Sequence, residues 1–207
     1  MRPLPRLYAI MDTLLVPPGG AVAVTEALLR AGIRLLQYRH KGPFLRRNWE
    51  ECREAARMAR EAGAMFLVND RADMALLAGA EGVHLGQDDL PPEAARRLLG
   101  ELKLVGYSTH NEGQAREADS LPVDYVAIGP VFPTATKENP GPVVGLEGVA
   151  AARRATGRPL VAIGGITRQN ARRVIEAGAD SVAVVRDLLA TENVEGNARE
   201  FLSVLER

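Results

Sequence analysis

The chain has 207 residues, and its 26 basic and 26 acidic side chains give a formal net charge of zero. With 46% hydrophobic and only 4% aromatic residues, the composition argues against a nucleic-acid partner, which needs basic patches and stacking platforms. The apolar run near the amino terminus is too short for a membrane span, so we expect one cytoplasmic enzyme domain over residues 1–207 with no membrane partner.

Short apolar or β-branched runs alternate with amphipathic segments from one end of the chain to the other. The expected strands are 6–11, 34–39, 64–69, 82–86, 103–109, 125–132, 159–165 and 181–187. The expected helices are 21–32, 48–63, 72–80, 91–100, 112–119, 146–157, 167–179 and 195–207. The single Cys52, in the second helix, has no partner for a disulfide, and we expect it to lie in the packing or at the surface.

The expected strands are almost continuously apolar, which is typical of parallel strands that are covered on both faces. Repeated βα units that close on themselves predict an α/β fold with a single (β/α)8 TIM barrel. An open flavodoxin-like sheet is the alternative, because the count of eight strands depends on short runs such as 82–86. In a barrel the carboxyl ends of the strands carry the chemistry, so the residues that follow each strand are the candidate site.

The second strand ends in the sequence QYRHK, residues 37–41. Strand alternation places Gln37, Arg39 and Lys41 on one side of this end. An amide, a guanidinium and an ammonium group on one face indicate a ligand with several anionic oxygens. Ordinary ion pairs at a solvated strand end are the alternative interpretation.

Two carboxylates, Asp70 and Asp89, follow the third and fourth expected strands. Parallel neighbours bring such residues to the same rim, where like charges repel unless a cation lies between them. Magnesium prefers carboxylate and phosphate oxygens, so the pair predicts a Mg²⁺ site, with salt bridges to Arg or Lys as the alternative. The three histidines are scattered along the chain, and we expect His84 to be a hydrogen-bonded imidazole of the core or rim.

Phosphate binding is indicated at two further places on this rim. Thr134, Thr136 and Lys137 follow the sixth expected strand and offer two hydroxyls and a point charge. The sequence IGGIT, which contains Gly165, follows the seventh, and the backbone of such a turn can hold a phosphate. Barrels commonly form a phosphate cup from the loops after strands seven and eight.

The chain resembles the thiamine-phosphate synthase family, also called thiamine-phosphate pyrophosphorylase. The resemblance covers nearly the whole chain and rests on LQYRHK, FLVNDRADMALLAGAEGVHLGQDDLP, GYSTH, DYVAIGPVFPTATK, GLEG, VAIGGIT and AGADSVAVV, in this order. It implies a (β/α)8 enzyme that joins 4-amino-2-methyl-5-(diphosphooxymethyl)pyrimidine to thiazole phosphate. The implied products are thiamine phosphate and pyrophosphate.

Roles for single residues follow from the same resemblance. It implies Mg²⁺ bound by Asp70 and Asp89, and charge neutralisation on the departing pyrophosphate by Arg39, Lys41 and Lys137. The implied contacts to the pyrimidine diphosphate are Gln37, Arg39, Lys41, Asn69, Ser108 and Lys137. Those to the thiazole phosphate are Thr134, Thr136, Gly165 and the backbone at Val185 and Arg186.

The chain departs from the family pattern at His40, usually an acidic residue, at Arg186, often Ser, and in its proline-rich segment 137–148. One alternative is the sister thiazole tautomerase, which carries a proton-transferring His where this chain has Pro130. Another is a phosphate-binding barrel without catalysis. The expected partners are phosphorylated small molecules, and assembly into a homo-oligomer stays open.

Overall fold

The computed structural model describes residues 3–136 and 141–206. Its strands are β1 (Leu7–Asp12), β2 (Leu35–Arg39), β3 (Met65–Asn69), β4 (Gly82–Leu85), β5 (Leu104–Thr109), β6 (Tyr125–Ile128), β7 (Leu160–Ile163) and β8 (Ser181–Val184). Its helices are α1 (Ala21–Ala31), α2 (Arg46–Glu61), α3 (Ala72–Ala78), α4 (Pro92–Leu99), α5 (Glu112–Ala118), α6 (Gly145–Ala155), α7 (Ala171–Glu176), α8 (Arg186–Leu189) and α9 (Val194–Glu206).

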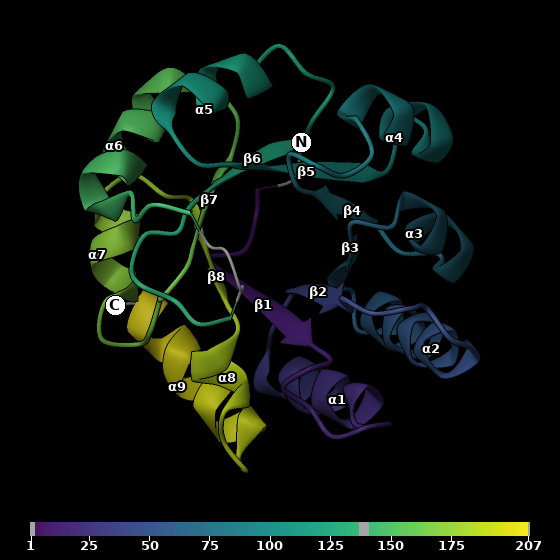
Figure 1. Ribbon diagram of the computed structural model, residues 1–207. Helices are drawn as coiled ribbons and strands as arrows, with labels where there is room; N and C mark the ends of the chain where they lie inside the picture. Colours follow the sequence, from purple (N-terminus) through teal and green to yellow (C-terminus); the bar gives the residue numbers. More distant parts are fainter. Residues whose placement is uncertain (1–2, 137–140, 207) are drawn as a thin grey trace.

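The strands form one closed barrel in chain order, and every neighbouring pair is parallel. Pairing of β1 with β8, which sets Leu7 opposite Val182, closes the ring. The helices surround the strands (Figure 1). The TIM-barrel prediction is therefore confirmed, and the open flavodoxin-like sheet is wrong.

Strand alternation divides the side chains into two layers, one inside the barrel and one between the barrel and the helices. The inner cluster contains Tyr8, Ile10, Leu35, Met65, Leu67, Tyr125, Ala127, Val161 and Ala183. The intervening strand residues pack outward against the helices in a second, larger cluster. The interior is thus a filled core and not a pore, so a ligand binds only at its ends.

Helix α2 shows why these segments form helices that cover the barrel. Its residues Cys52, Ala55 and Ala59 recur at helical spacing and are fully buried against the core. On the outer side Arg57 pairs with Glu54 and Glu61, three and four residues away. Burial raises the pKa of Cys52 to about 12, so this thiol is a packing residue.

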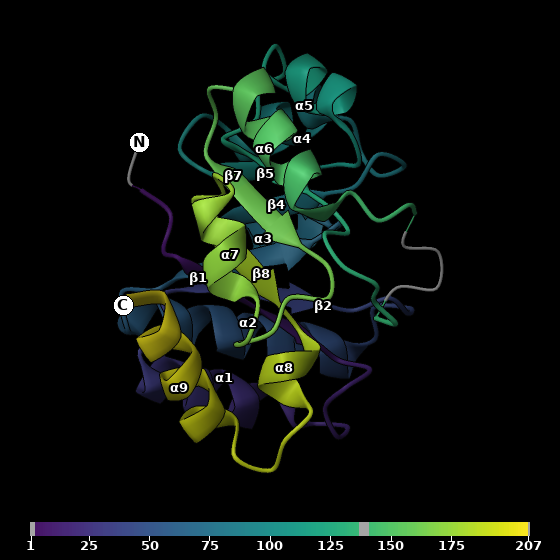
Figure 2. The same cartoon turned by 90° about the vertical axis from the view of Figure 1, so that its left-hand side faces the viewer.

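The largest differences from the expected elements lie near the carboxyl end of the chain. Residues 167–170 form a turn before α7, because the Asn170 side chain accepts the Thr167 N–H at 2.8 Å. The short helix α8 follows β8 directly, where an extended strand was expected. Helix α9 packs beside α1 and covers the seam between the last and first strands (Figure 2).

None of the helices in the parts of the chain that the structure describes is long and apolar enough to cross a membrane.

Candidate functional site at the carboxyl ends of the strands

The site residues that lie on strands share one parity, because they continue the inward-facing positions of the barrel. Gln37 follows the inward Leu35 by two residues, Asn69 follows Leu67, and Ser108 follows Gly106. These polar side chains form a layer directly above the apolar core. Four sequence-predicted residues, Gln37, Arg39, Asn69 and Ser108, occupy such positions, and Val185 lies just beyond β8 at the start of α8.

The two cations at and just after the end of β2, Arg39 and Lys41, each lie against a carboxylate. Arg39 forms an ion pair with Asp12, whose side chain is 1% exposed. Lys41 Nζ lies 2.5 Å from Asp70 Oδ2 at the next strand end. Asp12 received no role from the sequence, although its place at the end of the first strand matches that of Asp70. It orients the Arg39 guanidinium at the mouth of the barrel.

Asp70 has an unusual backbone conformation and an unusual carboxyl group. Its φ is 64°, and among the residues that the structure describes Asp70 is the only one other than glycine with a positive φ. Its backbone N–H donates to the His84 carbonyl at 2.8 Å. Burial and the neighbouring Asp89 carboxyl raise the pKa of Asp70, while Lys41 opposes the shift. Asp89 is itself oriented by the Gly86 N–H, which donates to its Oδ2 at 2.7 Å. The fold therefore brings the two carboxyls together, and Asp70 also forms the salt bridge to a Lys that was the alternative interpretation.

Asn69, next to Asp70, carries a buried donor with no partner. Its side-chain Nδ2 makes no hydrogen bond to any residue that the structure describes, and the residue is 7% exposed. A buried amide donor without an acceptor costs about 1–3 kcal/mol, so its position favours a ligand that accepts from it. Within the described ranges no three His, Cys, Asp or Glu side chains converge as a metal site by themselves.

His84 lies below these groups, on the inward face of β4. Its Nδ1 is 2.8 Å from the Tyr125 hydroxyl and its Nε2 is 2.8 Å from Ser108 Oγ. Burial lowers the pKa of His84 to about 4, so the imidazole is neutral near pH 7. His84 is thus the hydrogen-bonded core imidazole that was expected, and it contacts the predicted site residue Ser108.

The glycine turn after β7 packs tightly against the segment that follows β6. Gly164 and Gly165 both have positive φ, 102° and 62°. A Cβ on Gly165 would lie 2.5 Å from the Pro133 carbonyl oxygen, so only glycine fits there. Asn170 Nδ2 donates to the Gly165 carbonyl at 3.0 Å and holds the turn from the other side.

The structure brings Arg186 to the same region. Its Nη2 donates to the Ala135 carbonyl at 3.3 Å, which joins the start of α8 to the segment that contains Thr134 and Thr136. Both threonines are partly buried, and the Thr136 N–H donates to Thr134 Oγ1 at 3.3 Å. Lys137, predicted to bind the diphosphate, lies outside the described residues.

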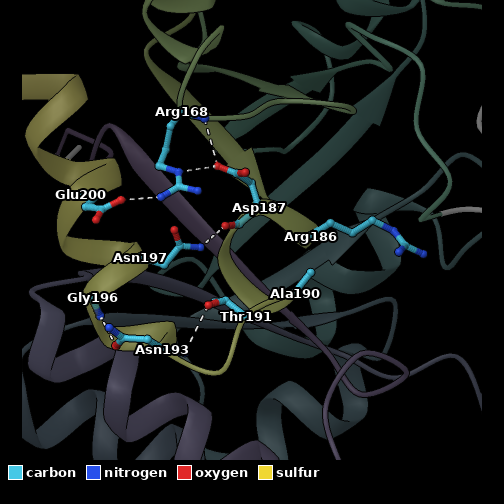
Figure 3. A pocket seen from close by; sticks show the side chains of 9 residues that line it. All are labelled: Arg168, Arg186, Asp187, Ala190, Thr191, Asn193, Gly196, Asn197 and Glu200. Carbon is cyan, nitrogen blue, oxygen red and sulfur yellow. Dashed lines mark hydrogen bonds and ion pairs between the residues drawn. The ribbon is translucent and has the colours of Figure 1, made fainter.

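A polar cavity of about 400 Å³ lies between α8 and α9, and Figure 3 shows the side chains that line it. Arg168 bridges the two helices, with Nε 3.2 Å from Asp187 and Nη1 2.5 Å from Glu200. Arg186 extends away from these ion pairs (Figure 3). Of the sequence-predicted site residues only Arg186 lines this cavity, and the Arg168 ion pairs at its wall join α8 to α9.

Comparisons with known proteins agree with this geometry. Residues 7–188 match the family model described as thiamine monophosphate synthase. The thiamine-phosphate synthase of Koribacter versatilis is 50% identical over 206 residues, which are 98% of this chain and 96% of that protein. The solved thiamine phosphate pyrophosphorylase of Pyrococcus furiosus is 34% identical, with a TM-score of 0.87 over 97% of this chain and 95% of that chain. On sequence and on structure, the chain belongs to the thiamine monophosphate synthase family.

Proposed function

We propose that this chain is a transferase that condenses 4-amino-2-methyl-5-(diphosphooxymethyl)pyrimidine with thiazole phosphate to form thiamine phosphate and release pyrophosphate. One observation carries the proposal furthest: the Asn69 Nδ2, which has no partner among the residues that the structure describes, lies next to the Asp70 carboxyl and its Lys41 partner at the barrel mouth. A donor without an acceptor, a cation and two adjacent carboxyls suit a metal-bound diphosphate.

Magnesium fits this donor set. Asp70 and Asp89 would hold the ion, because their adjacent carboxyls repel each other until a cation lies between them. Diphosphate oxygens and water would complete its ligands, which is the usual arrangement for Mg²⁺. When bound, the ion supplies positive charge that stabilises the pyrophosphate leaving group.

The diphosphate then lies among groups that neutralise its growing charge. Arg39, at the end of β2, and Lys41, two residues further on, supply positive charge, and we assign the same role to Lys137. Gln37, Asn69 and Ser108 donate hydrogen bonds from the inward face of the barrel. No strong base is required, because the nucleophile is a ring nitrogen that captures the pyrimidine cation after pyrophosphate departs.

We place the thiazole phosphate at the opposite side of the mouth. The backbone at Gly165, Val185 and Arg186 offers N–H donors, and Thr134 and Thr136 offer hydroxyls. Arg186 replaces the small residue common in the family, and its guanidinium already contacts the β6 segment at Ala135. It therefore adds a cation beside the proposed phosphate.

We further infer that the enzyme acts in the cytoplasm, an expectation that rests on the sequence alone.

The reaction is tested by mixing both phosphorylated heterocycles with the protein and Mg²⁺ and measuring thiamine phosphate and pyrophosphate. Asp89→Ala should lower kcat about a hundredfold, because it removes a preorganised electrostatic group. The affinity for thiazole phosphate, measured by calorimetry, should stay near that of the wild type.

Asp88→Ala is the matched control, since Asp88 is exposed and adjacent in sequence; its kcat should equal that of the wild type. Absence of pyrophosphate release by the wild type, with or without Mg²⁺, would leave the chain a binding protein or a tautomerase. Full activity of Asp89→Ala would contradict the proposed metal site.

A further inference from the structure

Five side chains form a continuous hydrogen-bonded chain across the inside of the barrel. Gln37 Nε2 donates to the Tyr8 hydroxyl at 2.7 Å, and the Tyr8 and Tyr125 hydroxyl oxygens are 3.1 Å apart. The Tyr125 hydroxyl is 2.8 Å from His84 Nδ1, and His84 Nε2 is 2.8 Å from Ser108 Oγ. These hydrogen bonds thus connect Gln37 and Ser108, two proposed contacts of the pyrimidine diphosphate. The three residues between them have no assigned role.

The middle of this chain is buried and closely packed. Tyr8 is 1% exposed, Tyr125 0% and His84 9%. The Tyr125 ring stacks on the His84 imidazole, with centroids 5.5 Å apart and planes at 22°. A Cβ on Gly106 would lie 2.0 Å from Tyr125 Cζ, so a glycine at this inward position makes room for the ring. The glycine at position 106 therefore leaves the space that the Tyr125 ring and its hydroxyl occupy.

The direction of the protons along the chain follows from counting donors. An amide nitrogen can only donate, so Tyr8 accepts from Gln37; the Tyr8–Tyr125 bond can run either way, and the direction from Tyr8 to Tyr125 is the one that gives the buried Tyr8 hydrogen an acceptor within the chain. In that direction Tyr125 would donate to His84 Nδ1, and the imidazole proton would lie on Nε2. His84 Nε2–H donates to Ser108 Oγ, and the hydroxyl hydrogen of Ser108 stays available to a ligand.

We propose that Tyr8, Tyr125 and His84 are positioning residues that hold His84 as its Nε2–H tautomer and direct the Ser108 hydroxyl hydrogen toward the bound pyrimidine diphosphate. Without the tyrosine hydroxyls no donor would favour the His84 tautomer in which Nδ1 is unprotonated. Ser108 could then donate its hydrogen to His84 as readily as to the substrate. A hydroxyl that already accepts a hydrogen bond is also a stronger donor. The assignment of the Ser108 ligand rests on the function proposed above.

The tautomer of His84 is the first test, because it is independent of catalysis. Correlation of the ring nitrogens with the ring carbon-bound protons by NMR distinguishes a protonated from a bare nitrogen in the ¹⁵N-labelled protein. We expect a proton on Nε2 in the wild type and a mixture of tautomers in Tyr125→Phe. A wild-type His84 with its proton on Nδ1 would overturn the proposal, even if the enzyme is fully active.

The second test is a double-mutant cycle between Tyr125→Phe and Ser108→Ala. If Tyr125 acts through Ser108, Tyr125→Phe should lower kcat about five- to tenfold in the wild type and less than about twofold in Ser108→Ala. Equal factors in the two backgrounds would overturn the proposal, because they would mean that Tyr125 affects kcat independently of Ser108. Tyr8→Phe replaces Tyr125→Phe in the same cycle if the latter does not fold.

Tyr38→Phe is the matched control. Tyr38 is also fully buried and its hydroxyl donates to Glu51 at 3.3 Å, but it packs between the barrel and the helices. It should lower the melting temperature about as much as Tyr125→Phe and leave kcat and the His84 tautomer unchanged.

If the wild type releases no pyrophosphate, the proposed function fails, whereas the tautomer result still decides the direction of the hydrogen-bonded chain.

Discussion

At the scale of single residues, Asp70 is unfavourable to stability in two separate respects. It has a left-handed backbone, which costs about 1 kcal/mol or more for a residue that is not glycine. Its carboxyl is partly buried beside Asp89, so the charged form is disfavoured in the absence of a cation. A residue that is strained in both respects is expected where function selects it over stability.

We therefore predict that Asp70→Asn stabilises the metal-free protein and abolishes activity. Asn tolerates the left-handed backbone as well as Asp, and it carries no charge. Because the folded-state pKa of Asp70 is raised, its carboxyl favours folding when protonated, and this contribution is lost as the pH rises through that pKa. The melting temperature of Asp70→Asn should exceed that of the wild type at pH 7, and the difference should shrink toward pH 4.

Asp73→Asn is the control for this prediction. Asp73 forms an exposed ion pair with Arg71, which lowers its pKa, so its loss should leave stability unchanged or slightly reduced at pH 7. A lower melting temperature for Asp70→Asn than for the wild type at pH 7 would show that the Lys41 ion pair outweighs burial and the Asp89 carboxyl.

At the scale of elements, the segment after β6 and the turn after β7 form one unit. The N–H of Val131 donates to the Ile163 carbonyl at 2.9 Å, and that of Phe132 donates to the Gly164 carbonyl at 3.0 Å. A Cβ on Gly164 would lie 2.5 Å from Pro130 Cβ, so the two segments are in direct contact. The proposed thiazole-phosphate side is thus built from two loops that cannot move independently.

Gly164→Ala should disturb both loops together. Its φ of 102° and the close Pro130 contact predict a loss of about 2–4 kcal/mol of stability. We expect weaker thiazole-phosphate binding by calorimetry and unchanged binding of Mg²⁺ with pyrophosphate. Gly157→Ala is the control, since a Cβ there meets nothing within 4 Å. Equal weakening of both ligands would show that the mouth is a single coupled site.

At the scale of the whole molecule, the amino end of the barrel carries stabilising contacts and the carboxyl end carries the candidate site. At the amino end, acidic residues just before β4, β6 and β8 accept a backbone N–H from the preceding strand: Glu81 from Phe66, Asp124 from Val105 and Asp180 from Leu160. Arg96, 9% exposed, pairs with Asp124 at 2.7 Å and also donates to the carbonyls of Pro122, Gly100 and Lys103. These contacts tie α4 to the barrel floor, far from the candidate site along the strands.

Arg96→Ala should therefore lower stability without changing catalysis. Breaking a buried charge pair costs about 3–5 kcal/mol, which corresponds to a melting temperature lower by about 6–20 °C. The kcat at a temperature well below unfolding should equal that of the wild type. Arg97 is the exposed neighbour of Arg96, and Arg97→Ala should change neither the melting temperature nor kcat. A reduced kcat in folded Arg96→Ala would show that the two ends of the barrel are coupled.

The sequence by itself determined the architecture and the composition of the rim. The alternation of apolar runs and amphipathic segments predicted the eight βα units, and the period of two predicted that Gln37 and Arg39 share a face. The ordered motifs identified the family, since no single short motif is that specific. Local patterns suffice for these conclusions because secondary structure and face are decided by neighbours along the chain.

Only the tertiary structure decided which side chains meet across the barrel. Tyr8 and Tyr125 are 117 residues apart in sequence, and His84 and Tyr125 are 41 apart, yet each pair is joined by a hydrogen bond. The pairing of Arg39 with Asp12 and the short helix α8 likewise depended on the stagger of the closed sheet and on packing against α9. Periodicity gives the face that a residue takes, whereas the register between strands sets its partners, and that register exists only once the barrel has closed.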